Sequence, residues 1–202
     1  MAWTLPNILT FFRVLAAPCV ALAFVLLERP LADWVALTLF VAAAVTDFFD
    51  GWLARKLGQM SELGKMLDPI ADKAMVIVAL VVLAWTHRAV DAWIVAAALI
   101  ATREVVVSGV REYLGDVKLP VTRLAKWKTT VQMVAIGVLL AVHPVFAWEA
   151  ARMPDEHWIG LNDFLGLAGV ILIWLAAAMT VLSGVDYLRK AAAILRKREE
   201  SR

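Results

Sequence analysis

Four aspartates in one stretch of this sequence have the type and spacing expected of a cation-binding site. Asp47 and Asp50 are three residues apart, and Asp68 and Asp72 are four residues apart. Residues at these spacings share one face of a helix, so each pair would project its carboxylates together. Long apolar segments flank both pairs, and a carboxylate at membrane depth is costly unless it is paired or binds a cation. Carboxylates converging from two helices would form a cage for hard divalent cations.

The composition shows a chain that is too apolar for a soluble domain. Hydrophobic residues make up 62% of the 202 residues, charged residues make up 19%, and nine residues are tryptophan. Continuous apolar runs of this kind are typical of membrane-spanning helices. We therefore expect an all-α, polytopic integral membrane protein with six transmembrane helices, in which residues 1–202 form a single domain.

Short polar links separate the expected spans. In chain order the spans cover residues 9–27, 34–56, 65–88, 91–113, 121–142 and 164–188. We expect the longest loop at residues 143–163 and a basic cytoplasmic tail at residues 189–202. The function of the long loop stays open.

The basic residues predict the orientation of these spans. Three of the twenty Lys and Arg residues, Arg29, Arg88 and Arg152, fall in the first, third and fifth loops, and the others fall on the opposite side. By the positive-inside rule, both termini are then cytoplasmic. The link between the two aspartate pairs lies on the same side, so the carboxylates would face the cytoplasm, within reach of soluble substrates.

Further residues extend the aspartates to a longer pattern, D-x-x-D-G-x-x-A-R, eight residues, then G-x-x-x-D-x-x-x-D. The matching residues are Asp47, Asp50, Gly51, Ala54, Arg55, Gly64, Asp68 and Asp72. Gly51 would let a nucleotide approach the backbone, and the small Ala54 is compatible with that approach. Arg55 offers a fork of donors suited to phosphate oxygens. With this motif the sequence resembles the CDP-alcohol phosphatidyltransferase family.

The resemblance implies an enzyme that transfers the phosphatidyl group of CDP-diacylglycerol to an alcohol, with two divalent cations, Mg²⁺ or Mn²⁺, as cofactors. Such cations can clamp a pyrophosphate. The implied metal ligands are Asp47, Asp50, Asp68 and Asp72. Asp72 is also the implied general base on the acceptor hydroxyl. The residues expected to bind CDP-diacylglycerol are Asn7, Thr10, Gly51, Ala54, Arg55 and Gly64.

Three further stretches bear on the acceptor: PNILTFFR at residues 6–13, TREVVVSGVREYLG at 102–115 and KWKTTVQM at 126–133. Together they resemble the branch of the family that joins CDP-diacylglycerol to glycerol 3-phosphate. Two helical turns separate Arg103 from Arg111, and Lys126 and Lys128 open the next span. An intramembrane basic cluster needs an anionic partner, which a phosphorylated acceptor would provide and neutral inositol would not.

Several alternatives stay open at this point. The aspartates could form interfacial salt bridges with Arg55, Lys65 and Lys73, and Asn7 and Thr10 could cap a helix. Arg103 could pair with Glu104 or Glu112, while Lys126 and Lys128 meet lipid headgroups.

Two other functions fit parts of this pattern. A sister transferase would use inositol phosphate, serine or phosphatidylglycerol as its acceptor. A cation-coupled transporter is disfavoured, because the sequence shows no inverted repeat and no paired broken helices. The resemblance further implies a homodimer in the bacterial inner membrane, with membrane lipids as partners and no nucleic acid.

Overall fold

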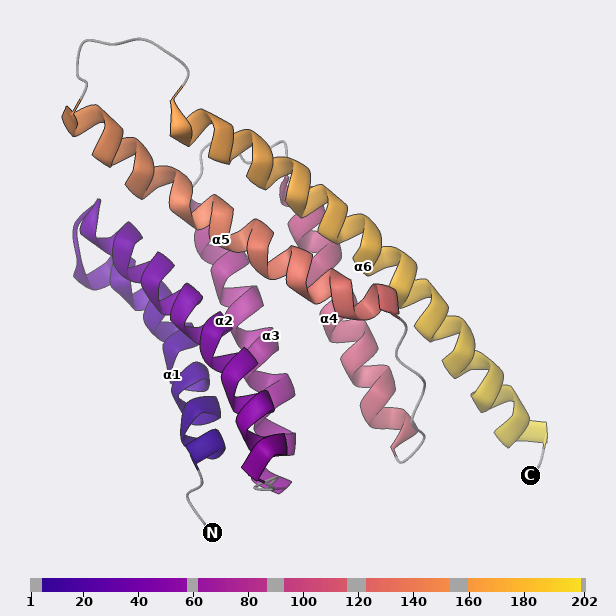
Figure 1. Cartoon of the computed structure of the whole chain (residues 1–202). Helices are drawn as coiled ribbons and strands as arrows, with labels where there is room; N and C mark the ends of the chain where they lie inside the picture. Colours follow the sequence, from indigo (N-terminus) through magenta and orange to yellow (C-terminus); the bar gives the residue numbers. More distant parts are fainter. Residues whose placement is uncertain (1–4, 58–61, 87–92, 116–122, 153–159, 201–202) are drawn as a thin grey trace. The chain divides into compact units, whose positions relative to one another are not determined.

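A computed structural model of the chain describes residues 5–57, 62–86, 93–115, 123–152 and 160–200. Within these ranges the chain forms six helices and no strand, which confirms the all-α prediction (Figure 1). The helices are α1 (Leu5–Leu26), α2 (Leu31–Leu57), α3 (Glu62–Thr86), α4 (Ile94–Leu114), α5 (Arg123–Arg152) and α6 (Leu161–Glu200). The first four agree with the expected spans to within a few residues at each end.

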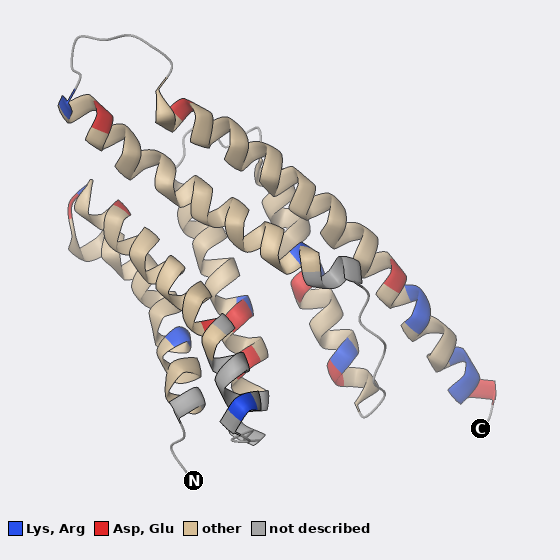
Figure 2. Ribbon diagram, viewed as in Figure 1, with Lys and Arg blue, Asp and Glu red and all other residues tan. Residues whose placement is uncertain are grey.

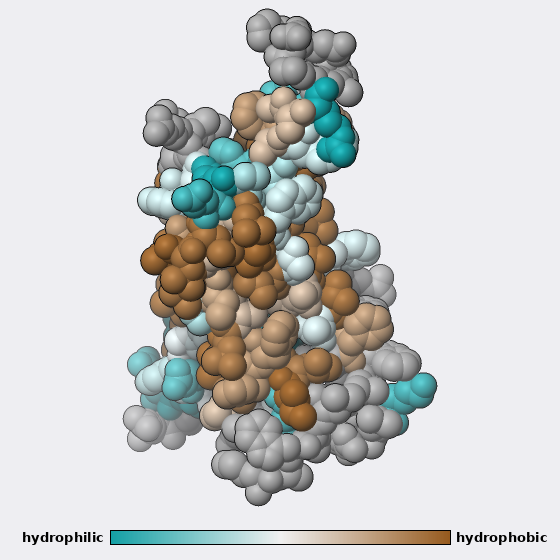
Figure 3. All heavy atoms as spheres, turned by 90° about the vertical axis from the view of Figure 1, so that its left-hand side faces the viewer, coloured by the Kyte–Doolittle hydropathy of each residue, from teal (hydrophilic) through white to brown (hydrophobic). Residues whose placement is uncertain are grey.

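The described helices have the apolar character of a membrane protein. Three stretches are long and apolar enough to cross a bilayer: Asn7–Leu26, Trp127–Arg152 and Leu161–Glu200. Large apolar side chains are exposed along the helices, among them Val25, Trp85 and Leu182. Figure 3 shows such atoms gathered over the middle of one face. A soluble protein rarely exposes so continuous an apolar surface, whereas lipid covers it in a membrane. The number of spans and their orientation stay predictions.

Two compact units make up the chain. Unit 1 comprises residues 1–88 and 136–169, and unit 2 comprises residues 89–135 and 170–202. Helices α5 and α6 are each divided between the two units, with one segment in each unit. In unit 1, α1 packs against α2 and α3, and the start of α1, the end of α2 and the start of α3 lie at the same end (Figure 1).

A buried stripe along α1 explains how α1 packs in unit 1. Its members lie three residues apart, except for the adjacent Ala16 and Ala17, and all are at most 5% exposed: Asn7, Thr10, Arg13, Ala16, Ala17, Val20 and Ala23. Small side chains let neighbouring helix backbones approach closely in a membrane, where lipid is as apolar as leucine. The same stripe that packs through alanine and valine therefore also buries three polar side chains near the start of α1.

The predicted loop at residues 143–163 is wrong over much of its length. Helix α5 continues to Arg152, with Pro144 inside it, and α6 begins at Leu161. The Glu149 carboxylate accepts hydrogen bonds from the backbone N–H groups of Leu161, at 2.7 Å, and Asn162, at 3.2 Å. A carboxylate there satisfies donors that lack partners within α6 and faces the positive end of its dipole. Residues 153–159 lie outside the described part.

The predicted basic tail continues α6 as one helix as far as Glu200 (Figure 2). Within it, Lys190 donates to Asp186 one turn earlier, at 2.7 Å. Both side chains are partly exposed. Such an exposed pair adds little to stability.

Two glycines of α6 provide a matched test of helix packing in unit 1. A Cβ on Gly169 would lie 2.6 Å from Leu139 Cδ2 and 2.8 Å from Leu139 Cγ, whereas a Cβ on Gly166 would meet no atom within 4 Å. We expect Gly169→Val to lower the unfolding free energy by about 1–3 kcal/mol through overpacking. Gly166→Val has the same helix propensity and should have a much smaller effect. Unfolding of both variants in detergent, followed by circular dichroism, measures the difference, and equal losses would contradict this packing.

Candidate active site

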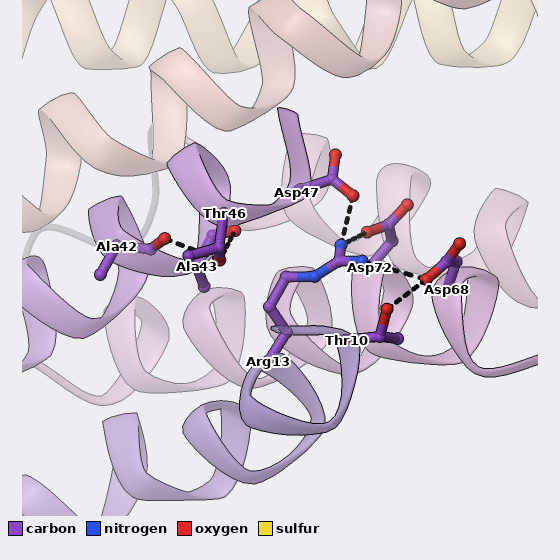
Figure 4. Close-up of polar contacts among 8 residues, drawn as sticks. All are labelled: Thr10, Arg13, Ala42, Ala43, Thr46, Asp47, Asp68 and Asp72. Atoms are coloured by element: carbon purple, nitrogen blue, oxygen red, sulfur yellow. Dashed lines mark hydrogen bonds and ion pairs between the residues drawn. The ribbon is translucent and has the colours of Figure 1, made fainter. Parts of the chain in front are cut away.

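Carboxylates from two helices of unit 1 converge on one buried cation (Figure 4). The cation is the guanidinium of Arg13 on α1. Its Nη1 donates to Oδ1 of Asp47, on α2, and at 2.7 Å to Oδ1 of Asp72, on α3. Its Nη2 donates to Oδ1 of Asp68 at 3.3 Å. The fold thus brings these three aspartates together, while their role as a cation site stays a prediction.

Exposure differs sharply between the cation and its partners. The Arg13 side chain is 3% exposed, whereas those of Asp47, Asp68 and Asp72 are 47%, 47% and 49% exposed. The guanidinium therefore lies beneath the carboxylates, and the carboxylates keep an open side. A ligand can reach their remaining lone pairs from that side without passing Arg13.

Thr10 holds one of these carboxylates from a second direction. It lies one turn before Arg13 on the buried stripe, is 2% exposed, and donates Oγ1 to Asp68 Oδ1 at 2.7 Å. Because α1 begins at Leu5, Thr10 is inside the helix, so the capping alternative is wrong for this residue. Asn7, one turn earlier, is 4% exposed. Contact of either residue with a nucleotide stays a prediction.

Sequence reasoning missed Arg13 as a member of the site. The signal was present, since an arginine inside an apolar span is costly and needs an anionic partner. Its spacing from Thr10, three residues, also placed both on one face of α1. Spacing within α1 does not tell which residues of α2 and α3 lie beside it. The partners of Arg13 therefore could not be predicted from the sequence.

The carboxylate oxygens of these aspartates are chemically suited to bind a divalent cation. Three carboxylate oxygens from α2 and α3 are directed at one positive centre, and hard cations such as Mg²⁺ prefer such oxygen ligands. Among the described side chains, no group of three or more His, Cys, Asp or Glu residues has the geometry of a metal site. Asp50 lies one turn after Asp47 in α2, but its side chain falls outside the described part.

Several other predicted residues cannot be placed by their side chains. Gly64 lies in the first turn of α3. The backbones of the remaining residues lie in α2 and α5, while their side chains are outside what the structure describes: Gly51, Ala54, Arg55 and Lys126. Lys65, an alternative partner of the aspartates, has the same status. The three described aspartates all form ion pairs with Arg13, and Asp68 also accepts the hydrogen bond from Thr10.

Unit 2 contains a second charged cluster, in which Glu104 joins two of the predicted basic residues. Lys128 Nζ donates to Glu104 Oε1, and Arg103 Nη1 approaches the same oxygen at 3.4 Å. Arg103 Nη2 lies 3.4 Å from Ser183 Oγ on α6. The side chains are 5% exposed for Lys128, 13% for Glu104 and 16% for Arg103. The alternative that paired Arg103 with Glu104 is thus confirmed.

Arg111 has different surroundings from Arg103. It is exposed, and its guanidinium carbon lies 5.9 Å from the centroid of the Tyr187 ring, a cation–π contact. Gly184, between Ser183 and Tyr187 in sequence, leaves room for Arg103, because a Cβ there would lie 3.0 Å from Arg103 Cγ. Sequence reasoning missed Ser183 and Tyr187, which lie about one turn apart on α6.

The model of the CDP-alcohol phosphatidyltransferase family matches residues 3–182. The chain belongs to this family of transferases.

Proteins of named activity are similar to this chain over nearly its whole length. A protein of Cereibacter sphaeroides is 47% identical over 219 residues, spanning 97% of this chain and 99% of that protein. One of Haemophilus influenzae is 35% identical over 196 residues, spanning 95% of each. One of Escherichia coli K12 is 35% identical over 199 residues, spanning 96% and 98%. Each is named a CDP-diacylglycerol–glycerol-3-phosphate 3-phosphatidyltransferase.

The buried Glu104 cluster generates a stability prediction. Glu104→Gln would leave Lys128 buried without its anionic partner, and we expect a loss of roughly 3–5 kcal/mol in unfolding free energy. The matched control is Asp186→Asn, which removes the acid of an exposed pair and should cost only about 0.3–0.5 kcal/mol. Unfolding by sodium dodecyl sulfate, monitored by circular dichroism, compares the two variants. Similar small losses in both would show that the Glu104 contacts do not stabilise unit 2.

Proposed function

We propose that this protein transfers the phosphatidyl group of CDP-diacylglycerol to glycerol 3-phosphate, which yields phosphatidylglycerol phosphate and CMP. The observation that carries the proposal is the convergence of Asp47, Asp68 and Asp72 on one centre, within a member of the CDP-alcohol phosphatidyltransferase family. The names of relatives that are similar over nearly the whole chain support the choice of donor and acceptor.

The aspartates are proposed to serve the nucleotide end of the donor. Asp47, Asp50, Asp68 and Asp72 would hold two divalent cations, Mg²⁺ or Mn²⁺, which offset the charge of the pyrophosphate. The residues proposed to contact the nucleotide are Asn7, Thr10, Gly51, Ala54, Arg55 and Gly64. The open side of the carboxylates supports this assignment, because a phosphate group can approach there.

Asp72 is the proposed general base. It would take the proton of the 1-hydroxyl of glycerol 3-phosphate, whose oxygen then bonds to the β-phosphorus of CDP-diacylglycerol. The bond from that phosphorus to CMP breaks, and CMP leaves with the electron pair. The half-exposed position of Asp72 supports this role, because the carboxylate is accessible to an acceptor from outside the helix bundle of unit 1.

The basic residues of unit 2 are proposed to bind the phosphate of the acceptor: Arg103, Arg111, Lys126 and Lys128. Arg103 and Lys128 share one carboxylate, so the set that they form with Glu104 keeps one net positive charge. A phosphorylated acceptor can compensate that charge, whereas a neutral one cannot. This observation favours glycerol 3-phosphate or another phosphorylated alcohol over neutral inositol.

The remaining proposals concern the membrane. We infer a single domain with six spans, both termini cytoplasmic, and a site that faces the cytoplasm of a bacterial inner membrane. The supporting observations are the three long apolar helices, the bacterial relatives and the one-sided distribution of basic residues. A homodimer surrounded by lipid is proposed from the family resemblance.

The direct test of the function is an acceptor panel. Purified enzyme would receive labelled CDP-diacylglycerol and either glycerol 3-phosphate, inositol phosphate, serine or phosphatidylglycerol, with Mg²⁺, with Mn²⁺ or with chelator. We expect labelled lipid product and CMP with glycerol 3-phosphate, in the presence of metal only. Product with one of the other acceptors instead would assign the enzyme to a sister activity.

The assignment of the base predicts the behaviour of Asp72→Asn. Turnover should fall about 10²–10⁴-fold, because the amide cannot accept the hydroxyl proton, while metal-dependent CDP-diacylglycerol binding partly survives. Asp186→Asn, on the exposed part of α6, is the control and should keep full turnover. Rates of CMP release and equilibrium binding of the labelled donor separate the two effects. Normal turnover of Asp72→Asn would exclude it as the base.

The acceptor assignment predicts a selective change in Arg103→Ala. Loss of a hydrogen-bonded charge should raise the KM for glycerol 3-phosphate about 10–100-fold, while the KM for CDP-diacylglycerol stays nearly constant. Lys190→Ala removes a partly exposed basic residue of the same unit and should change neither constant. Steady-state kinetics with each substrate varied in turn give both values. A change confined to the CDP-diacylglycerol constant would contradict the assignment.

A further inference from the structure

The guanidinium of Arg13 and a divalent cation would require the same carboxylates. Arg13 donates to the Oδ1 atoms of Asp47, Asp68 and Asp72, and these three aspartates are also proposed metal ligands. A guanidinium carries five N–H donors and no acceptor, so it cannot ligate a metal and can only repel one. The two cations therefore oppose each other at this site.

We propose that Arg13 is a tethered counter-cation, which holds the three carboxylates together in the metal-free enzyme and competes with the divalent cation for them. The inference rests on the proposed metal-binding role of these aspartates. It makes Arg13 a positioning residue that lowers metal affinity while it stabilises the metal-free site.

The burial of Arg13 explains why it stays at the site. Its side chain is 3% exposed and lies on the stripe that continues through Ala16 and Ala17, which are 3% and 0% exposed. A buried charge that loses its partner is strongly destabilising, so the carboxylates keep Arg13 in place. Equally, carboxylates brought together without a cation repel each other, and Arg13 reduces that repulsion.

The two cations would approach the carboxylates from opposite sides. A metal would enter from the open side of the half-exposed carboxylates, opposite the guanidinium beneath them. Each hydrogen bond from Arg13 engages a carboxylate oxygen and spreads positive charge toward the incoming cation. Metal binding must therefore weaken the contacts to Arg13. The free energy lost in those contacts makes metal binding weaker.

The test uses Arg13→Gln, which removes the charge but keeps a hydrogen-bond donor. Two quantities are measured in detergent on the full chain without substrate: the dissociation constant of Mn²⁺, by electron paramagnetic resonance, and the unfolding temperature with and without Mn²⁺. We expect the metal-free variant to unfold several degrees below the wild type. We expect Mn²⁺ to bind the variant about tenfold more tightly and to narrow the gap in unfolding temperature.

Two further variants make the outcome decisive. Arg13→Lys keeps the charge and should keep both wild-type stability and the weaker Mn²⁺ affinity, so it reports on competition even where Arg13→Gln folds poorly. Arg103→Gln removes a basic residue of unit 2 that also contacts an acid, and it should leave the Mn²⁺ constant unchanged.

The contrary results separate this inference from the proposed function. Mn²⁺ binding that is unchanged or weaker in Arg13→Gln would overturn the competition, while leaving the aspartates as metal ligands. Tighter binding in Arg13→Lys equal to that in Arg13→Gln would also overturn it, because the charge would then be irrelevant. Absence of Mn²⁺ binding in the wild type and in every variant would overturn both the inference and the metal-binding role.

Discussion

The contact between one buried guanidinium and three carboxylates is the interaction on which unit 1 depends. A charge at apolar depth must be compensated, and the carboxylates of α2 and α3 compensate Arg13 where both helices reach α1. The small residues of the α1 stripe permit that approach, and Thr10 on the same stripe orients Asp68. The buried stripe of α1 therefore has two roles in unit 1. It packs α1 against α2 and α3, and it places the guanidinium of Arg13 beside the carboxylates.

Unit 2 obeys the same constraint with the opposite balance of charge. In unit 1, three carboxylates surround one guanidinium, so the cluster is negative and suits metal cations. In unit 2, Lys128 and Arg103 share the single carboxylate of Glu104, so the cluster is positive and suits an anion. The two balances match the substrates of a phosphatidyl transfer, in which a metal-bound pyrophosphate reacts with a phosphorylated alcohol. The net charge of each cluster thus supports the ligand proposed for its unit.

The sequence predicted those features that depend on local spacing. Intervals of three and four residues placed the aspartates on common helix faces, and continuous apolar runs predicted the helices. The sequence did not predict features that depend on which residues of different helices lie side by side. Arg13 and Ser183 were therefore not assigned to their clusters. Glu104 was named only as one of two partners for Arg103. The loop prediction at residues 143–152 failed because Pro144 and the polar Glu149 look like loop residues, although Pro144 is buried in α5 and Glu149 binds the start of α6.

The measurement that tests the central claim most directly is anomalous diffraction from crystals of the enzyme grown with Mn²⁺ and a cytidine nucleotide. The account predicts manganese peaks bonded to carboxylate oxygens of Asp47, Asp68 and Asp72, with the Arg13 guanidinium withdrawn from at least one of them. It would be contradicted by a fully occupied nucleotide with no manganese at these carboxylates, while Arg13 still bridges all three.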